Sequence, residues 1–241
     1  MSIIYEPTGK AKEYSELAAN LYRGCSHACS YCYAPAATFT DRKKFCQNIQ
    51  PRKDVLNQLS KDIIKFKRDE RQILLSFTSD AYQPIEEKLR ITRAALRMMV
   101  NEGLRVTVLT KGGRLATRDF DILSESDHSQ FAATLTTDDN DESLLWEPGA
   151  ALPDERLSSL QAAHAAGIFT WVSFEPVFNP EAVYRLIDST AAYVVFYKVG
   201  KMNYHKLPTP INWVAFRESV IAKLEAYGKP YLIKKDLLQA K

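Results

Sequence analysis

Short apolar runs alternate with longer amphipathic segments along most of the chain, and this alternation constrains the fold more than any other feature. The apolar runs are typical of buried strands, and the segments between them carry apolar residues at helical spacing. Strands are expected at about 17–22, 72–77, 105–110, 130–136, 168–174, 193–199 and 231–233. Helices are expected at 51–69, 85–101, 115–124, 153–166, 180–190 and 212–227.

Six strand-then-helix units followed by a last strand predict parallel strands joined by right-handed crossovers. We therefore expect an α/β fold: a single-domain partial (β/α)6 barrel at about 17–233, within one domain that covers 1–241. A doubly wound open sheet is the alternative. The segment 137–152 is expected to be a long connection that shapes the mouth of the barrel.

Composition and charge place few limits on function. The chain is 46% hydrophobic and 25% charged, as in ordinary globular proteins, and its net charge of +3 permits an anionic partner without requiring one. The first residues contain no apolar signal region, and no run of about 18 apolar residues follows. We therefore expect a cytoplasmic protein with no membrane span. In reducing cytosol, clustered cysteines are more often metal-binding or catalytic than disulfide-bonded.

Three of the four cysteines, Cys25, Cys29 and Cys32, lie in the short segment 24–33, which reads GCSHACSYCY. Three thiolates on so short a loop can hold one iron–sulfur cluster. A cubane with three protein ligands leaves one iron open to an amine and a carboxylate, which S-adenosylmethionine (SAM) offers. A zinc site completed by His27 or Cys46 is the competing interpretation, although no second ligand pair of the usual spacing is visible.

The Cys-x3-Cys-x2-Cys spacing, with an aromatic residue before the third cysteine, resembles the radical SAM superfamily. Several stretches resemble its spore photoproduct lyase-like (DNA-repair photolyase-like) branch: NLYRGCSHACSYCYAP (20–35), FTSDAYQPIE (77–86), TKGG (110–113), EPGA (147–150) and KVGKMNYH (198–205). The resemblance implies a partial barrel, a [4Fe-4S] cluster and reductive cleavage of SAM to a 5′-deoxyadenosyl radical. It also implies a flavodoxin- or ferredoxin-type electron donor, with nucleic acid among the substrate classes left open.

Polar residues at the expected strand ends are candidates for binding SAM. Ser79 and Asp80 follow the second strand and are expected to bond the amine or the ribose. Lys111 follows the third strand and is expected to pair with the carboxylate. Thr134 or Thr136, at the end of the fourth strand, would reach the ribose. The resemblance implies SAM contacts at the Ser79, Lys111 and Thr134 positions.

Other candidates are expected on the substrate side. Glu175 ends the fifth strand, and Lys198 and Lys201 flank the end of the sixth. These charges are expected to line the substrate site, with a structural Glu–Lys pair as the alternative. Tyr31 and Tyr33 bracket Cys32, and the resemblance implies that they pass a radical between substrate and SAM. Packing against SAM or the cluster is the alternative for Tyr33.

The resemblance breaks at one position. Spore photoproduct lyase has a hydrogen-donating cysteine directly before the Thr-Ser-Asp run, where this chain has Phe77. A phenyl ring has no weakly bound hydrogen to give, so we do not expect efficient repair by the lyase's route. The alternative function is a zinc-stabilised module that holds nucleic acid with basic residues such as Arg42, Lys43 and Lys44.

Overall fold

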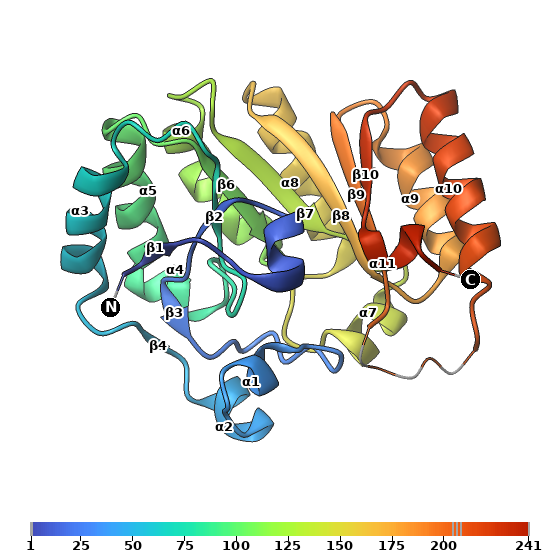
Figure 1. Cartoon of the computed structure of the whole chain (residues 1–241), viewed down its shortest axis with the longest axis horizontal. Helices are drawn as coiled ribbons and strands as arrows, with labels where there is room; N and C mark the ends of the chain where they lie inside the picture. Colours follow the sequence, from blue (N-terminus) through green and yellow to red (C-terminus); the bar gives the residue numbers. More distant parts are fainter. Residues whose placement is uncertain (1, 204, 206, 208, 241) are drawn as a thin grey trace.

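One eight-stranded sheet organises the computed structural model, which describes residues 2–203, 205, 207 and 209–240 (Figure 1). The strand order is β1-β2-β5-β6-β7-β8-β9-β10. The strands are β1 (Ile4–Tyr5), β2 (Leu17–Ala19), β5 (Ile73–Leu75), β6 (Val106–Thr110), β7 (Gln130–Thr134), β8 (Phe169–Val177), β9 (Phe196–Lys201) and β10 (Tyr231–Ile233). Every neighbouring pair from β2 to β10 is parallel, and β1 pairs antiparallel with β2.

Helices connect these strands and pack on the outer face of the sheet (Figure 1). They are α3 (Val55–Phe66), α4 (Ile85–Leu89), α5 (Ile91–Asn101), η2 (Gly113–Asp119), α6 (Phe120–Leu123), α8 (Pro153–Ala165), α9 (Pro180–Thr190) and α10 (Trp213–Ala226). The further helix α7 (Asn140–Trp146) contributes none of its residues to the core on this face. The predicted α/β fold, a partial barrel of six strand–helix units and a last strand, is confirmed. The sheet stays open, because β1 and β10 are not paired with each other.

The two faces of the sheet have different environments because side chains alternate along each strand. In β8, Val172 and Phe174 belong to the large core between sheet and helices. Trp171 points to the inner face, where it forms a small cluster with Leu74 and Ala132. The inner face therefore keeps room for a site, while the outer face supplies most of the buried apolar area.

Three expectations for local structure need correction. The helix expected at 85–101 is two helices, because Arg90 adopts a left-handed backbone conformation between α4 and α5. The helix expected at 115–124 begins as the 3-10 turn η2. The connection expected at 137–152 contains α7, whose N-cap Asp139 accepts a hydrogen bond from the Glu142 N–H at 2.8 Å. An Asp that can cap a helix, followed three residues later by a Glu, is a helix-start signal in the sequence that would have predicted α7.

Several short elements lie outside the barrel units. The segment after the cysteines forms α1 (Ala34–Ala37) and α2 (Arg42–Gln47), which project from the body of the molecule (Figure 1). A two-stranded ribbon, β3 (Tyr22–Arg23) with β4 (Gln50–Pro51), leads into and out of this projection. The remaining elements are η1 (Gly9–Glu13) and α11 (Lys235–Leu238). Within the described ranges, no helix has both the length and the apolar character needed to cross a membrane.

A buried carboxylate ties the ribbon to the helical layer. Glu86 is fully buried and accepts hydrogen bonds from the Tyr22 hydroxyl and from the Thr92 N–H, the latter at 3.0 Å. Arg118 Nη2 lies 2.7 Å from Glu86 Oε1, and Arg118 also pairs with Asp119. Glu86 therefore joins β3, α5 and η2, and it does not line the cavity described below.

We predict that Glu86→Ala lowers the free energy of unfolding by roughly 3 kcal/mol, because removal of one partner leaves a half-buried guanidinium less compensated. Chemical denaturation measures the effect. The matched control is Glu125→Ala, which breaks the exposed pair of Glu125 with Arg97 and should cost far less. Equal losses in the two variants would contradict a structural role for the buried carboxylate.

Candidate active site

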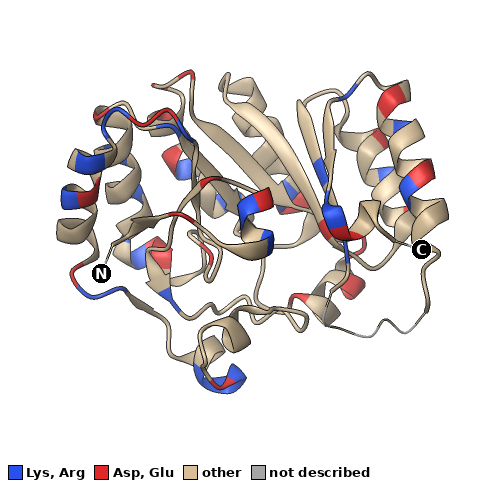
Figure 2. Cartoon of the chain, in the orientation of Figure 1, with Lys and Arg blue, Asp and Glu red and all other residues tan. Residues whose placement is uncertain are grey.

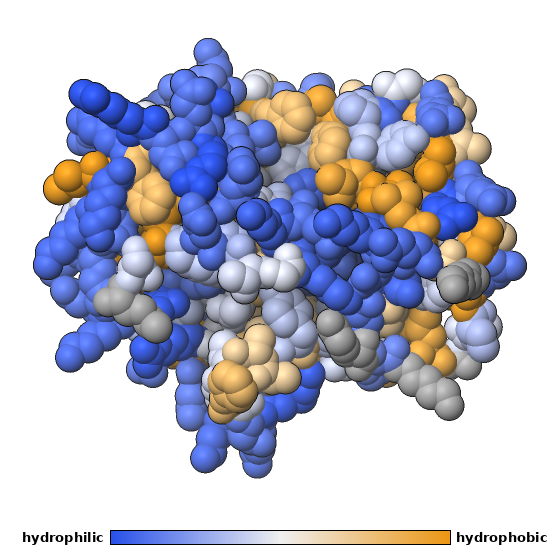
Figure 3. Space-filling model, viewed as in Figure 1, coloured by the Kyte–Doolittle hydropathy of each residue, from blue (hydrophilic) through white to orange (hydrophobic). Residues whose placement is uncertain are grey.

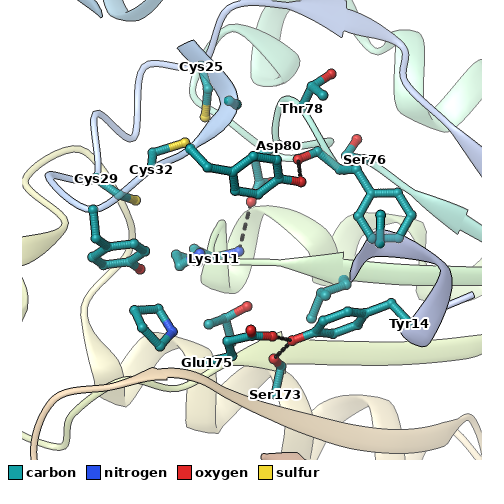
Figure 4. Close-up of a pocket in the computed structure, with 18 of the residues that line it drawn as sticks. Tyr14, Cys25, Cys29, Cys32, Ser76, Thr78, Asp80, Lys111, Ser173 and Glu175 are labelled. Atoms are coloured by element: carbon teal, nitrogen blue, oxygen red, sulfur yellow. Dashed lines mark hydrogen bonds between the residues drawn. The ribbon is translucent and has the colours of Figure 1, made fainter. Parts of the chain in front are cut away.

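A cavity of about 410 Å³ opens at the carboxyl ends of the parallel strands (Figure 4). Each strand from β5 to β10 contributes residues from its carboxyl-terminal part or from the loop after it: Ser76, Phe77, Thr78, Ser79, Asp80, Thr110, Lys111, Thr134, Ser173, Glu175, Lys201 and Lys234. Barrels of parallel strands place their active sites at this end, because the loops after the strands converge there.

The three clustered cysteines line this same cavity (Figure 4). Cys25, Cys29 and Cys32 form no disulfide. Burial raises the pKa of Cys29 to about 12 and also raises the pKa of Cys25. Such thiols stay neutral unless a bound cation compensates the thiolate, as cluster iron does. Three unpaired thiols of one loop, facing one cavity, therefore fit the ligand set of an iron–sulfur cluster. Among the described residues, no three His, Cys, Asp or Glu side chains already form a metal-binding group.

The backbone of the cysteine loop is held on its inner side by Gln83 and Gly149. The buried Gln83 amide accepts the Ser26 N–H at 3.0 Å and donates to the Gly24 carbonyl at 3.3 Å. Gly149 donates its N–H to the His27 carbonyl at 3.0 Å. A Cβ at position 149 would lie 2.1 Å from the Ser26 carbonyl oxygen, so only glycine allows this approach. The loop therefore has a defined shape from protein contacts alone.

Asp80 links the cysteine loop to the end of β6. Its carboxylate accepts the Thr110 hydroxyl at 2.6 Å and the Lys111 N–H at 2.9 Å, and it lies 3.4 Å from His27 Nδ1. Burial opposes ionisation of Asp80, but the interactions with His27, Thr110 and Lys111 hold its pKa well below the usual value. Both oxygens are thus engaged within the protein. The predicted contact of Asp80 with SAM stays a prediction, and its position fits a residue that orients the loop.

Lys111 reaches the cavity beside the cysteines. Its Nζ lies 5.8 Å from the centre of the Tyr31 ring. The Tyr31 hydroxyl donates to the buried carboxylate of Glu147, which lies 2.5 Å from Arg156 Nη2. Burial opposes the charged form of Lys111, but an ionised Cys29 thiolate and the Glu147 carboxylate raise its pKa overall. Within the described part of the chain, Lys111 Nζ donates no hydrogen bond, so a cation faces the cavity and is available to an anionic group.

Two hydroxyl groups at the end of β5 also face the cavity. The Oγ atoms of Ser76 and Ser79 are buried and have no hydrogen-bond partner among the described residues. An unsatisfied buried polar group costs roughly 1–3 kcal/mol, so these hydroxyls fit a site that a polar ligand completes. Thr134 lines the cavity as well. Thr136 is buried but lies outside the lining, so its position gives no support to the expected contact with ribose.

The wall opposite the cysteines carries a hydrogen-bonded group of four residues, of which Tyr14, Ser173 and Glu175 are labelled in Figure 4. The Tyr14 hydroxyl lies 2.7 Å from Ser173 Oγ and donates to Glu175. Lys234 Nζ lies 3.0 Å from both carboxylate oxygens of Glu175. A Cβ at Gly200 would lie 2.8 Å from Glu175 Cδ, so the glycine makes space for this pair. Glu175 therefore lines the cavity, and its lysine partner is Lys234.

The two lysines expected at the mouth lie in different places. Lys201 lines the cavity. Lys198 lies on the other side of Tyr14, donates to the Tyr14 carbonyl at 2.7 Å and lines a second cavity at the opposite end of the barrel. Burial and the nearby charge of Lys234 lower the pKa of Lys198 to about 8. The expected position of Lys198 was wrong because β9 continues to Lys201, which leaves Lys198 within the strand.

Tyr33 and Phe77 meet at the edge of the cavity. The Tyr33 hydroxyl donates to the Phe77 carbonyl at 2.9 Å, and both side chains line the cavity. The Asn20 side chain accepts the Phe77 and Thr78 N–H groups at 2.9 and 3.0 Å. Asn20 therefore fixes the turn that carries Phe77 and Ser79, and it is the first residue of the 20–35 stretch that resembles the lyase-like branch.

The chain matches the sequence model of the radical SAM superfamily over residues 19–185. An uncharacterized protein of Methanocaldococcus jannaschii is 27% identical over 187 residues, which cover 76% of this chain and 69% of that protein. An uncharacterized protein of Mycobacterium tuberculosis (strain H37Rv) is 28% identical over 165 residues, which cover 66% of this chain and 48% of that protein. This chain thus matches about half the length of the mycobacterial relative.

Solved structures share the fold at low sequence identity. A variant of spore photoproduct lyase with bound AdoMet and dinucleoside spore photoproduct aligns with a TM-score of 0.72 and 14% identity, covering 95% of this chain and 78% of that one. SuiB of Streptococcus suis, bound to S-adenosylmethionine, aligns with a TM-score of 0.67 and 11% identity, covering 90% of this chain and 49% of that one. With the family match over residues 19–185, these findings establish that the chain belongs to the radical SAM superfamily of enzymes, whose cofactors are a [4Fe-4S] cluster and SAM.

Proposed function

We propose that this protein holds one [4Fe-4S] cluster through Cys25, Cys29 and Cys32 and uses it to cleave SAM reductively. The observation that carries the proposal is that all three thiols and the polar groups at the strand ends line one cavity. When bound, the cluster and SAM supply a 5′-deoxyadenosyl radical that takes a hydrogen atom from the substrate, with release of methionine.

We assign different residues of the cavity to different groups of SAM. We assign the Lys111 ammonium to the SAM carboxylate, because it is a cation without a hydrogen bond within the described part of the chain. The buried Ser79 hydroxyl, which lacks a partner among the described residues, is assigned to the amine. Thr134 is assigned to the ribose. Asp80 acts on these groups indirectly, since it fixes the Lys111 backbone and His27.

The opposite wall is the proposed substrate side. Glu175, held by Lys234 and Tyr14, and Lys201 offer a carboxylate and an ammonium to a substrate. We propose that Tyr33 contacts SAM or substrate at the cavity edge, while Tyr31 supports Lys111. Because Phe77 presents no thiol at the end of β5, we propose a reaction that differs from repair by spore photoproduct lyase in its hydrogen-donating step.

Partners are proposed from the chemistry of the family. The cluster needs a one-electron donor, for which we propose a flavodoxin- or ferredoxin-type protein in the cytoplasm. Nucleic acid stays among the proposed substrates, because the structural neighbour is described with a bound dinucleoside spore photoproduct. No comparison supports the zinc-stabilised nucleic-acid-binding module.

Anaerobic assay with dithionite and SAM tests the proposal. We predict release of methionine and 5′-deoxyadenosine without added substrate, since cluster and SAM suffice for cleavage. Cys25→Ala, Cys29→Ala and Cys32→Ala should each abolish cleavage or cluster assembly, because each removes one thiolate ligand. Cys46→Ala is the matched control and should keep iron near the wild-type level. Iron lost only with Cys46→Ala, or wild-type protein with a full cluster and no cleavage, would contradict the proposal.

A second prediction concerns the SAM carboxylate. Lys111→Ala should weaken SAM binding by roughly ten- to a hundredfold, because a hydrogen bond to a charged group contributes about 1.5–3 kcal/mol. Calorimetry on cluster-loaded protein measures the affinity, and iron analysis should show no change. Lys88→Ala, at an exposed position on α4, is the control. Unaltered affinity in Lys111→Ala would remove this residue from the SAM site.

A further inference from the structure

The projecting helix α2 covers the outer side of the cysteine loop and contacts the backbone of all three cysteines. The Phe45 carbonyl accepts the Cys25 N–H at 3.1 Å. The Arg42 guanidinium donates to the Cys29 carbonyl at 2.9 Å and to the Cys32 carbonyl at 2.7 Å. The α1–α2 projection is therefore the layer of protein between the proposed cluster ligands and solvent on this side (Figure 1).

The outer surface of this projection combines an aromatic side chain with positive charge. Phe39 is 98% exposed, and its φ of 53° is uncommon for a bulky residue. Arg42, Lys43 and Lys44 follow it at exposed positions on α2. Figure 3 shows hydrophobic side chains gathered on the projecting part beside hydrophilic ones, and Figure 2 shows Lys and Arg over α2. An exposed aromatic side chain close to an arginine fits a contact surface, because aromatic residues and Arg are enriched at protein interfaces.

The neighbouring ribbon extends the positive charge. Arg23 lies on β3, and Arg52 directly follows β4. Burial lowers the pKa of Arg52, and the nearby charge of Arg23 lowers it further. The acidic side chains along this stretch are Asp41, which caps α2 through the Lys44 N–H at 3.0 Å, and Asp54. Basic groups therefore outnumber acidic ones, so the surface is complementary to an acidic partner.

The patch formed by Phe39, Arg42, Lys43 and Lys44 does not face the substrate cavity. None of the residues from 35 to 53, all of which the structure describes, lines that cavity. A molecule bound on this patch thus reaches the cysteine loop from outside and leaves the cavity free. This position suits a partner that exchanges electrons with the cluster better than a nucleic acid that must enter the cavity to react.

We propose that this patch is the docking surface for an acidic one-electron donor protein of the flavodoxin or ferredoxin class. The inference rests on the proposed function. In the encounter the donor loses one electron and the cluster gains it, with no bond made or broken. Electron-transfer complexes are small and transient, so one aromatic group and a few cations suffice for docking, and charge complementarity mainly raises the association rate.

The test measures the rate of cluster reduction in the holoenzyme. A purified acidic flavodoxin, reduced to its hydroquinone, is mixed anaerobically with wild type and with the Lys43→Glu/Lys44→Glu double variant. We expect the association-limited rate at low salt to fall by roughly tenfold or more, and the wild-type rate to fall as salt is added. Dithionite, which needs no docking surface, should reduce both proteins at the same rate.

Two further variants make the result specific. Lys61→Glu/Lys88→Glu changes the net charge equally at exposed positions on α3 and α4 and should leave the flavodoxin rate close to that of wild type. Phe39→Asn removes the aromatic ring while suiting a left-handed backbone, and should slow reduction by flavodoxin only.

Several outcomes would overturn the docking surface. The first is an equal rate of cluster reduction by flavodoxin in wild type, the double variant and Phe39→Asn. The second is a rate of reduction by dithionite that falls in the variants as much as the rate with flavodoxin, because that would mean damage to the cluster loop. If flavodoxin reduces the cluster of the double variant at the wild-type rate, but the double variant binds a single-stranded oligonucleotide more weakly than wild type, the patch is a nucleic-acid surface instead. A wild-type cluster that is reduced by flavodoxin through this patch but cleaves no SAM would contradict the proposed function and leave the docking surface standing.

Discussion

The site depends on the hydrogen bonds that hold the backbone of the cysteine loop. Gln83 and Gly149 bind it from the barrel side, and Arg42 and Phe45 bind it from α2. These contacts use backbone groups, so they orient Cys25, Cys29 and Cys32 without occupying any thiol. The protein's own hydrogen bonds therefore hold the loop against the cavity that the three thiols line.

Charge balance around the loop follows from the same arrangement. Thiolates and a reduced cluster are anionic, and a low-dielectric interior makes an uncompensated charge costly. Lys111 and Arg156 supply positive charge beside Cys29, while Glu147 pairs with Arg156 and receives the Tyr31 hydroxyl. On the opposite wall of the cavity, the Lys234 ammonium likewise compensates the Glu175 carboxylate. The cavity thus has two charged walls, one assigned to SAM and one to substrate.

The sequence predicted the barrel and much of the cysteine side of the cavity. Alternating strands and helices specify parallel topology, and residues after parallel strands converge at one end. Ser79, Lys111 and Thr134, expected from strand ends and from the family resemblance, all line the cavity there. Tyr14 and Lys234 could not be found this way, because each reaches Glu175 only through the tertiary fold. Lys198 was misplaced because strand ends depend on one or two residues, which apolar patterning does not resolve, while the position of Thr136 gives no support to its expected contact. The roles of the site residues stay predictions.

We propose above all that the cysteine loop holds a cluster whose open iron binds SAM in this cavity. Electron–nuclear double resonance on the dithionite-reduced protein, with SAM carrying ¹⁵N in the amino group and ¹⁷O in the carboxylate, tests it most directly. We expect hyperfine coupling of both labelled groups to the reduced cluster in wild type. A fully loaded, reduced cluster that shows no coupling to either label at saturating SAM would contradict it.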